Sequence, residues 1–417
     1  MSGSKAGWRT RWVAAAACAT AVGCSSEPAP RSAATPAGPG TVCQSDPRPL
    51  TLADGIQLYV EPQNLFPVGG ELLVSGTPTY SFDVGVGRNA AVRSRGAYVA
   101  AFLGDPARAV PNPIDGVVES VTAVALGEGR WAAIFKEVDT DTVPGGERQI
   151  GLWYGEHDGS SWSLVEPMPA PASMQLSLRA SSRLVRAGDR LAWVAQEASL
   201  EDLAVHFYAR VDGAWRSTRL PDPFAEGVAL GYEEGSGLWL VLIGVDPDLP
   251  GWQKSIRLYR ENTGWELVSR VAILESGVEV LWPSVTVLPG GVTISWIRAS
   301  QDGVRALART GIAPGNDGTL LVLDEGAEYL VPVSMPDSAL AWVVDHADPI
   351  TQLRELRLLR IVGESAARVA STPSPLTGFF SVAPIGPDEV LVVGPEMGTA
   401  PTQAPVRSLI LRLSASC

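Results

Sequence analysis

Glycine residues recur along this chain at intervals close to fifty residues, and this period constrains the fold more than any other feature. Each glycine follows an apolar or aromatic residue by five positions, as Gly159 follows Tyr154. The glycines are Gly104, Gly159, Gly213, Gly264, Gly311 and Gly363, which lie 55, 54, 51, 47 and 52 residues apart. Glycine between runs of alternating apolar residues is typical of turns that join strands. The sequence therefore predicts a repeated unit built from β-strands.

Tryptophans inside apolar runs form a second series, which we expect to mark the inner strand of each unit. They are Trp131, Trp193, Trp239, Trp296 and Trp342. The stretch Asp189 to Trp215 shows one unit in detail, with strands expected at Leu191 to Ala195 and Leu203 to Arg210 and a turn at Asp212-Gly213. A period near fifty with about four strands per unit predicts an all-β fold, a β-propeller with seven four-stranded blades.

The repeats assign nearly the whole chain to blades. The expected units are Gly55 to Val110, Val117 to Val165, Met174 to Leu220, Gly227 to Arg270, Val278 to Leu323, Tyr329 to Ala370 and a last unit from Gly378. The last unit has three expected strands and lacks an outer one. Gln44 to Leu52 has no other strand to pair with, so we expect it to complete this blade and remove a bare sheet edge. Residues 43–417 are thus predicted to form a single propeller domain.

The first residues have the pattern of an export signal. Lys5, Arg9 and Arg11 precede the short apolar run Trp12 to Val22, which is too short for a stable membrane-spanning helix. The run ends in Ala21-Val22-Gly23-Cys24, which resembles a bacterial lipobox, although the commonest form has Leu in place of Ala21. The resemblance implies lipidation of Cys24 and removal of residues 1–23. An ordinary secretory signal that is cut nearby is the alternative.

The residues after Cys24 indicate a tether. Residues 24–42 are rich in Pro, Ala and Ser and lack apolar periodicity, so we expect a flexible segment. The lipobox resemblance and Ser25 after the cysteine imply the cell envelope, with the outer membrane as the destination. Two cysteines remain in the folded part, Cys43 and Cys417, and two cysteines in an exported chain favour one disulfide.

No particular propeller family is matched. The spacing from Tyr208 to Trp215 is similar to a kelch repeat, but most units lack the Gly-Gly pair of that family. The Gly-His and Trp-Asp signatures of WD40 repeats are absent, and Asp158 to Trp162 only approaches a sialidase-type box. The resemblance therefore extends to the general architecture alone.

Charge and motifs exclude several classes of function. The formal net charge of −13 gives no basic surface for nucleic acid. Gly85 to Ala90 has the spacing of a dinucleotide fingerprint, but no helix is expected after it. The three histidines, His157, His206 and His346, accompany no nucleophile elbow and no metal-ligand spacing.

Acidic residues gather in the loops expected between the second and third strands of successive blades. They are Asp139, Asp141, Glu197, Glu201, Asp202, Asp246, Asp248, Asp302, Asp345 and Asp348, with His346 among them. Such loops emerge on one face of a propeller and could hold Ca²⁺ or attract a cationic partner. A solvated acidic rim is the alternative. The candidate cation face comprises Asp139, Asp141, Asp246, Asp248, Asp345, His346 and Asp348, and no other cofactor is evident.

The sequence thus predicts a lipid-anchored, extracytoplasmic propeller that serves as a binding or scaffold module. The expected partners are the membrane, through the anchor, and a protein or glycan, and the chain is expected to be a monomer. One alternative is a hydrolase or lyase that uses carboxylates at the channel mouth. Another is a subunit of an envelope assembly complex, which would expose a large apolar patch.

Overall fold

The structure is a computed structural model of the chain. It describes residues 43–44, 47–51, 60–68, 71–78, 97–100, 108–115, 117–139, 148–170, 176–177, 183–197, 204–220, 225–288, 290–336, 339–348, 350–351, 353–362, 365–376, 380–387, 389–396 and 408–414. All of these belong to the compact unit Arg31–Cys417; the other unit is Met1–Pro30. The predicted signal, Cys24, the tether and Cys417 lie outside the described residues.

The described strands form seven separate antiparallel sheets. The first three sheets comprise β3 (Val60–Val68), β4 (Glu71–Pro78), β5 (Ala97–Ala100) and β6 (Arg108–Ala109); β7 (Val117–Gly127), β8 (Arg130–Asp139), β9 (Arg148–His157) and β10 (Trp162–Pro167); and β11 (Leu176–Ser177), β12 (Val185–Ala187), β13 (Arg190–Glu197), β14 (Val205–Val211) and β15 (Ala214–Arg219). In the third sheet both β11 and β12 pair with β13.

The next three sheets each contain four consecutive strands. They comprise β16 (Ala225–Glu233), β17 (Gly237–Val245), β18 (Lys254–Glu261) and β19 (Trp265–Leu274); β20 (Glu279–Leu288), β21 (Gly291–Ser300), β22 (Gly303–Ile312) and β23 (Thr319–Glu325); and β24 (Ala327–Ser334), β25 (Leu340–Ala347), β26 (Arg354–Val362) and β27 (Ser365–Pro373). A short 3₁₀ turn, Pro250–Trp252, interrupts the loop between β17 and β18.

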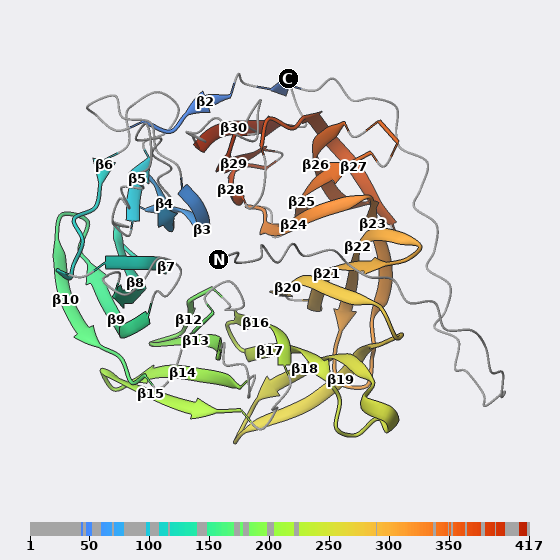
Figure 1. Ribbon diagram of the computed structural model, residues 1–417, viewed down its shortest axis with the longest axis horizontal. Coiled ribbons are helices and arrows are strands. Elements are labelled where there is room, and N and C mark those ends of the chain that lie inside the picture. The colour runs from blue at the N-terminus through green and yellow to red at the C-terminus, as the bar shows by residue number, and fades with distance from the viewer. Residues whose placement is uncertain are drawn as a thin grey trace, which may run out of the picture. The chain divides into compact units, whose positions relative to one another are not determined.

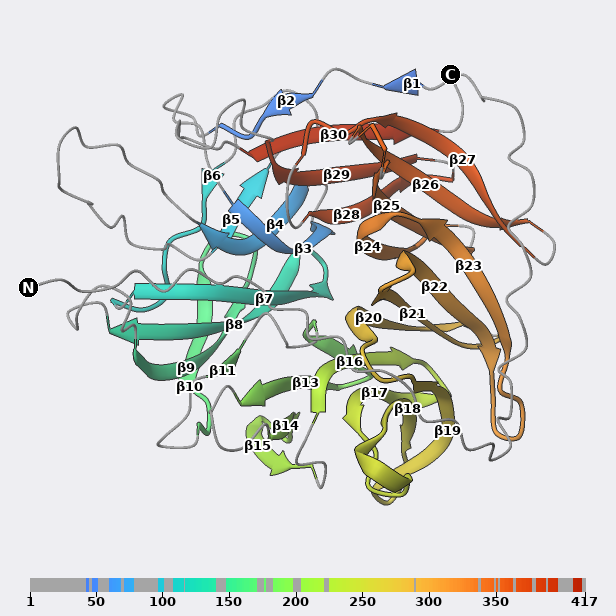
Figure 2. The same cartoon turned by 45° about the vertical axis from the view of Figure 1, so that its right-hand side comes forward.

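The last sheet unites the two ends of the propeller domain. It contains β28 (Ser381–Gly386), β29 (Glu389–Pro395) and β30 (Ser408–Ser414), and β30 pairs with β1 (Cys43–Gln44) and β2 (Arg48–Pro49). Cys43 lies opposite Ser414, and Pro49 lies opposite Leu409. Figure 2 shows β1 and β2 beside β30. The prediction that an N-terminal strand completes the last blade is confirmed.

The sheets follow one another in chain order around a common axis (Figure 1). First strands of consecutive sheets contact each other, as β16 contacts β20 and β24 contacts β28. The last of them, β28, contacts the first, β3. This arrangement of mostly four-stranded antiparallel sheets is a β-propeller, so the predicted all-β propeller fold is confirmed.

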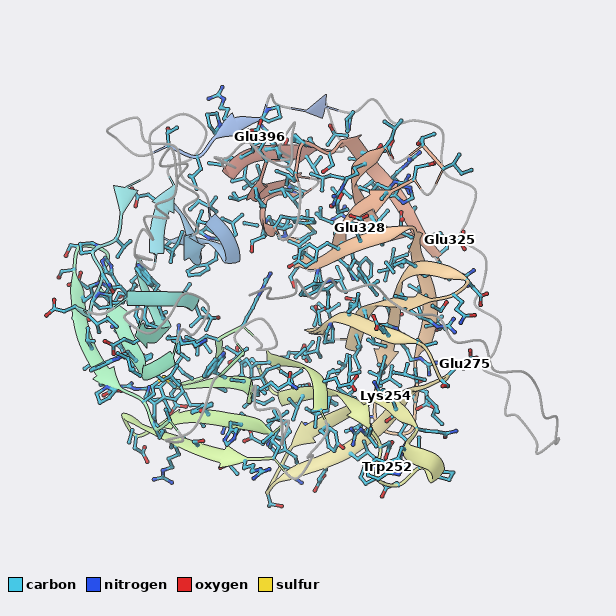
Figure 3. All side chains as sticks on the ribbon, in the orientation of Figure 1. Trp252, Lys254, Glu275, Glu325, Glu328 and Glu396 are labelled. Atoms are coloured by element: carbon cyan, nitrogen blue, oxygen red, sulfur yellow. The ribbon has the colours of Figure 1, made fainter. Side chains whose placement is uncertain are left out.

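Buried apolar side chains fill the space between neighbouring sheets, as the sticks of Figure 3 show. Seven clusters of such residues occur in the described part of the chain, and each joins two consecutive sheets. In one of them Leu65 of β3 packs with Leu391 of β29, which connects the last sheet to the first. The hydrophobic core is therefore a series of interfaces between sheets rather than one central mass.

The five tryptophans of the second series lie on β8, β13, β17, β21 and β25, the second strand of each sheet. Their assignment to the inner strand is therefore wrong. Each is at most 4% exposed and packs between sheets, so a position one strand away from the axis gives a large ring apolar neighbours on both sides. In the glycine series, Gly159, Gly213 and Gly264 lie between third and fourth strands as predicted, whereas Gly311 lies inside β22.

The first strands tolerate proline, which conceals them in the sequence. Pro62 and Pro67 lie in β3, and Pro283, Pro332 and Pro384 lie in β20, β24 and β28. A first strand has a partner on one side only, so a proline can replace the N–H that faces the axis. The strand expected at Ile56 to Val60 shares only Val60 with β3, and its other residues lie outside the described part.

Candidate functional site: the central cavity

A cavity of about 690 Å³ lies among the first strands of the sheets. Its lining comes from β3, β7, β16, β20, β24 and β28 and from Arg183, which precedes β12. Glycines on β16 allow these strands to approach closely, because a Cβ at Gly231 would lie 3.1 Å from a side-chain atom of Val285. The cavity is therefore built from backbone elements that the sheets hold in place.

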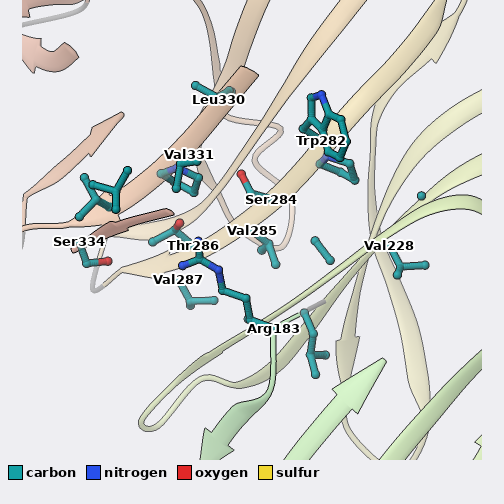
Figure 4. Close-up of a pocket in the computed structure, with 18 of the residues that line it drawn as sticks. Arg183, Val228, Trp282, Ser284, Val285, Thr286, Val287, Leu330, Val331 and Ser334 are labelled. Carbon is teal, nitrogen blue, oxygen red and sulfur yellow. The ribbon is translucent and has the colours of Figure 1, made fainter. Parts of the chain in front are cut away.

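Two charged residues line the cavity, Arg183 and Glu226. The carboxylate of Glu226 is 2.6 Å from Nζ of Lys254, so its charge is balanced. Among the described residues, Arg183 has neither an ion-pair partner nor a hydrogen-bond partner for its side chain. Figure 4 shows this side chain extending into the cavity toward the strand that carries Thr286 and Val287. Within the described part of the chain, the cavity thus holds one positive charge without a partner.

The side chain of Arg183 is reached by solvent and is also closely surrounded by protein. Its side chain is exposed to the solvent of the cavity, while desolvation by the surrounding protein lowers the pKa of its guanidinium. The backbone beside it is fixed, because the N–H of buried Leu184 donates to Oγ1 of Thr122 on β7 at 3.1 Å. The side chain of Arg183 therefore extends from backbone that is tied to β7.

Tyr329 on β24 lies in the same cavity. Its ring packs edge-to-face against Trp282 at 5.2 Å and against Phe380 at 4.9 Å between centroids. Burial raises the pKa of Tyr329 to about 12, although the charge of Arg183 opposes this. The phenol therefore stays protonated at neutral pH and can donate a hydrogen bond to a ligand.

The acids between β17 and β18 form an internal network. Asp246 is 1% exposed, and its Oδ2 accepts hydrogen bonds from Oγ of Ser255 at 2.7 Å and from Nε of Arg270 at 2.9 Å. Burial alone would raise the pKa of Asp246, but these hydrogen bonds outweigh it and lower the pKa. Exposed Asp248 also contacts Arg270. Both carboxylates are therefore paired with the same arginine, Arg270.

The prediction that Asp345 and His346 lie in a loop is wrong, because both belong to β25, where they are paired in the same way. Asp345 is fully buried and contacts Arg354, which also lies 2.9 Å from Glu328. Burial raises the pKa of Asp345 to about 6, although Arg354 opposes the shift. His346 Nδ1 lies 2.6 Å from Oδ1 of Asp324, whose other oxygen is 2.7 Å from Arg357.

The remaining members of the predicted cation face are less informative. Asp348 accepts backbone N–H bonds from Thr351 and Ile350, which lower its pKa and stabilise a turn. Asp139 ends β8, and Asp141 lies outside the described residues. Within the part of the chain that the structure describes, no three His, Cys, Asp or Glu side chains come together as a metal site. Of the acids that the sequence singled out, Asp246 and Asp345 therefore pair with arginines of other segments, and Asp348 stabilises a turn.

Sequence reasoning missed Arg183 and Tyr329. Neither residue belongs to a motif, and the sequence shows only that Arg183 stands shortly before the residues that form β12.

No helix among the described residues is long and apolar enough to cross a membrane.

Comparison with known proteins relates this chain to others by fold. No protein-family model matches the sequence, and no curated protein matches it either. A protein of unknown function from Dyadobacter fermentans has a TM-score of 0.53 at 12% identity, with 90% of this chain and 99% of that chain covered. Oligogalacturonate lyase from Vibrio parahaemolyticus has a TM-score of 0.53 at 12% identity, covering 89% and 98%.

An oligogalacturonate lyase in complex with manganese gives a TM-score of 0.55 at 13% identity, with 90% of this chain and 96% of that chain covered. Identities this low establish a shared fold. The chain is thus similar in architecture to proteins that include two named as oligogalacturonate lyases.

Proposed function

We propose that this chain is a lipid-anchored, extracytoplasmic binding module that takes up a small molecule in its central cavity. We further propose that the seven sheets act as seven blades of one closed ring, because each core cluster joins consecutive sheets and one joins the last to the first. A closed ring gives the cavity a wall on every side.

The cavity is the observation that carries the proposal. Its volume of about 690 Å³ falls within the range typical of small-molecule sites, which are concave and largely preformed. The acidic loops offer less, because Asp246 and Asp345 are buried and paired with arginines. The side chains that can bind a ligand, Arg183 and Tyr329, therefore lie in the cavity rather than at the acidic face.

A matched pair of cavity variants tests the proposal. The neutral dye N-phenyl-1-naphthylamine gains fluorescence in apolar surroundings, and we expect saturable binding to the purified domain. Thr286→Trp would fill the cavity and weaken binding at least about tenfold. Thr218→Trp on the exposed strand β15 makes the same substitution outside it and should leave binding unchanged. Equal binding by all three proteins would refute a cavity site.

The anchor is tested through Cys24. Cys24→Ala should move the protein from the membrane fraction to the soluble envelope fraction, because several acyl chains hold a lipoprotein firmly to a bilayer. Ser25→Ala serves as a control with the cysteine intact. If wild type and Cys24→Ala fractionate alike, the lipobox interpretation is wrong.

A carbohydrate lyase is the second candidate, and the presence of Arg183 and Tyr329 in one cavity supports it. An arginine can neutralise the carboxylate of an acidic sugar, and a tyrosine can exchange a proton beside it. The similar propellers named as oligogalacturonate lyases make oligogalacturonate the substrate to try. Formation of an unsaturated product, lost in Tyr329→Phe, would establish the activity; without such a product the binding function stands alone.

A further inference from the structure

The charge balance of the cavity is unusual for this protein. The chain carries 45 acidic and 32 basic residues, yet the uncompensated charge that faces the cavity is positive. Glu226, the other charged residue of the lining, is held by Lys254. A buried or partly desolvated charge without a partner is costly. Arg183 therefore marks a position where a bound anion would lower the free energy.

Besides Arg183 and Tyr329, the lining contains several side chains with hydroxyl groups, among them Thr122, Ser284, Thr286 and Ser334. Ser284 is engaged, because its Oγ lies 2.6 Å from Oγ of Ser295. Oγ1 of Thr122 already accepts the N–H of Leu184. A sugar would bring many hydroxyl groups that each need a partner on entering the cavity. Ser284 and Thr122 are thus already engaged, which leaves fewer side-chain partners for the hydroxyl groups of a sugar.

Most of the other lining residues have apolar side chains, although polar and apolar atoms contribute about equally to the cavity surface. Val285 and Val287 on β20 and Val331 on β24 are among these residues, and Trp282 and Phe66 add aromatic surface. Figure 4 shows these strands around the arginine. Such a wall gains free energy in proportion to the apolar area that a ligand removes from water. A cation beside apolar side chains is suited to a ligand that has an anionic head and an apolar body.

We propose that the cavity binds an organic anion with a single carboxylate or sulfonate head and an apolar body, and that Arg183 pairs with the head. This inference rests on the proposed function as a cavity-binding module. A guanidinium binds such a head through two parallel N–H bonds, which are stronger than bonds between neutral groups. Tyr329, whose ring also lines the cavity, can provide a further donor.

Two dyes with the same skeleton test the inference. 8-Anilinonaphthalene-1-sulfonate carries an anionic head, and N-phenyl-1-naphthylamine lacks it. Wild type should bind the sulfonate at least about tenfold more tightly, which corresponds to one charge-assisted hydrogen bond. Arg183→Gln should lose this preference and keep its affinity for the neutral dye, whereas Arg183→Lys should retain part of the preference. Arg216→Gln, an exposed arginine on β15, removes the same charge elsewhere and should behave as wild type.

The outcomes separate the two proposals. Equal affinity of wild type for both dyes, or an unchanged preference in Arg183→Gln, would overturn the anion inference while the cavity remains a binding site. Failure of wild type to bind either dye would overturn the proposed function itself. If Arg183→Gln binds neither dye, Arg183→Lys decides: a retained preference for the sulfonate supports the inference, and its loss with intact neutral-dye binding overturns it. Displacement of the sulfonate dye by decanoate but not by 1-decanol would extend the result to carboxylates.

Discussion

The buried carboxylate of Asp345 should make the stability of this propeller depend on pH. Asp345 is fully buried, and its one cationic contact, Arg354, is shared with Glu328. Burial therefore outweighs the arginine and raises the pKa of Asp345 to about 6 in the folded protein, from 3.8 for the ordinary side chain. The perturbation we propose is Asp345→Asn, which keeps the shape of the side chain and removes its titration.

The sign follows from proton linkage. Because the folded state has the higher pKa, it binds the proton more tightly than the unfolded state, so protonation of Asp345 stabilises the fold. This contribution is complete below about pH 4 and is lost as pH rises through 6. One pKa unit corresponds to about 1.4 kcal/mol. Between pH 5 and pH 8 we therefore expect Asp345 to lower the free energy of unfolding by about 1.4 kcal/mol.

Chemical unfolding of wild type and Asp345→Asn at pH 5, 6, 7 and 8 measures this contribution. The difference between the two proteins cancels the titration of the other acids, and it should change by about 1.4 kcal/mol in favour of the variant as pH rises. Asp302→Asn, in an exposed turn, provides the control with no such change. A pH-independent difference for Asp345→Asn would refute the argument, and a change of opposite sign would show that Arg354 dominates over burial.

Two further predictions concern the last sheet. Leu50, which follows β2 and is 1% exposed, packs with the first and last sheets, so Leu50→Ala should lower the free energy of unfolding by about 2–5 kcal/mol. The control Leu353→Ala, at an exposed position, should change it by no more than about 0.5 kcal/mol. Equal effects of the two substitutions would contradict the role of the N-terminal segment. We also predict a disulfide between Cys43 and Cys417, whose reduction should lower the melting temperature. Closing a loop of about 375 residues contributes about 6 kcal/mol in the chain-entropy model, before any strain. Free thiols at both positions in the mature protein would contradict this prediction.

The fold was predictable because residues with the same structural role recur in successive repeats, in particular glycines in turns and tryptophans between sheets. Gly159 and Gly213 adopt positive φ angles of 99° and 75° in the turns after third strands. The spacing between these glycines therefore equals the number of residues in one repeat. Trp193 and Trp342 fill the space between sheets and repeat for the same reason. The first strands were harder to place, because they have a free edge and can contain proline, as β3 does.

The candidate site was not predictable to the same degree, because a sequence shows charges without their partners. The sequence predicts that Asp246 lies in an exposed loop, but its carboxylate accepts a hydrogen bond from Arg270, which is 24 residues later in the chain. Arg183 shows the converse case. It is one of 32 basic residues, and only the convergence of first strands from several sheets places it in a cavity without a partner.

The pairing of β1 and β2 with β30 also fixes the order of events during synthesis. β1 and β2 leave the ribosome well before β30, the strand with which they pair. At about 5–20 residues per second, the roughly 360 residues between Pro49 and Ser408 take about 20–70 s to make. During this interval the N-terminal strand must stay unpaired, and the ring cannot close. Any factor that holds residues 43–51 in that window would compete with β30 and so delay completion of the propeller.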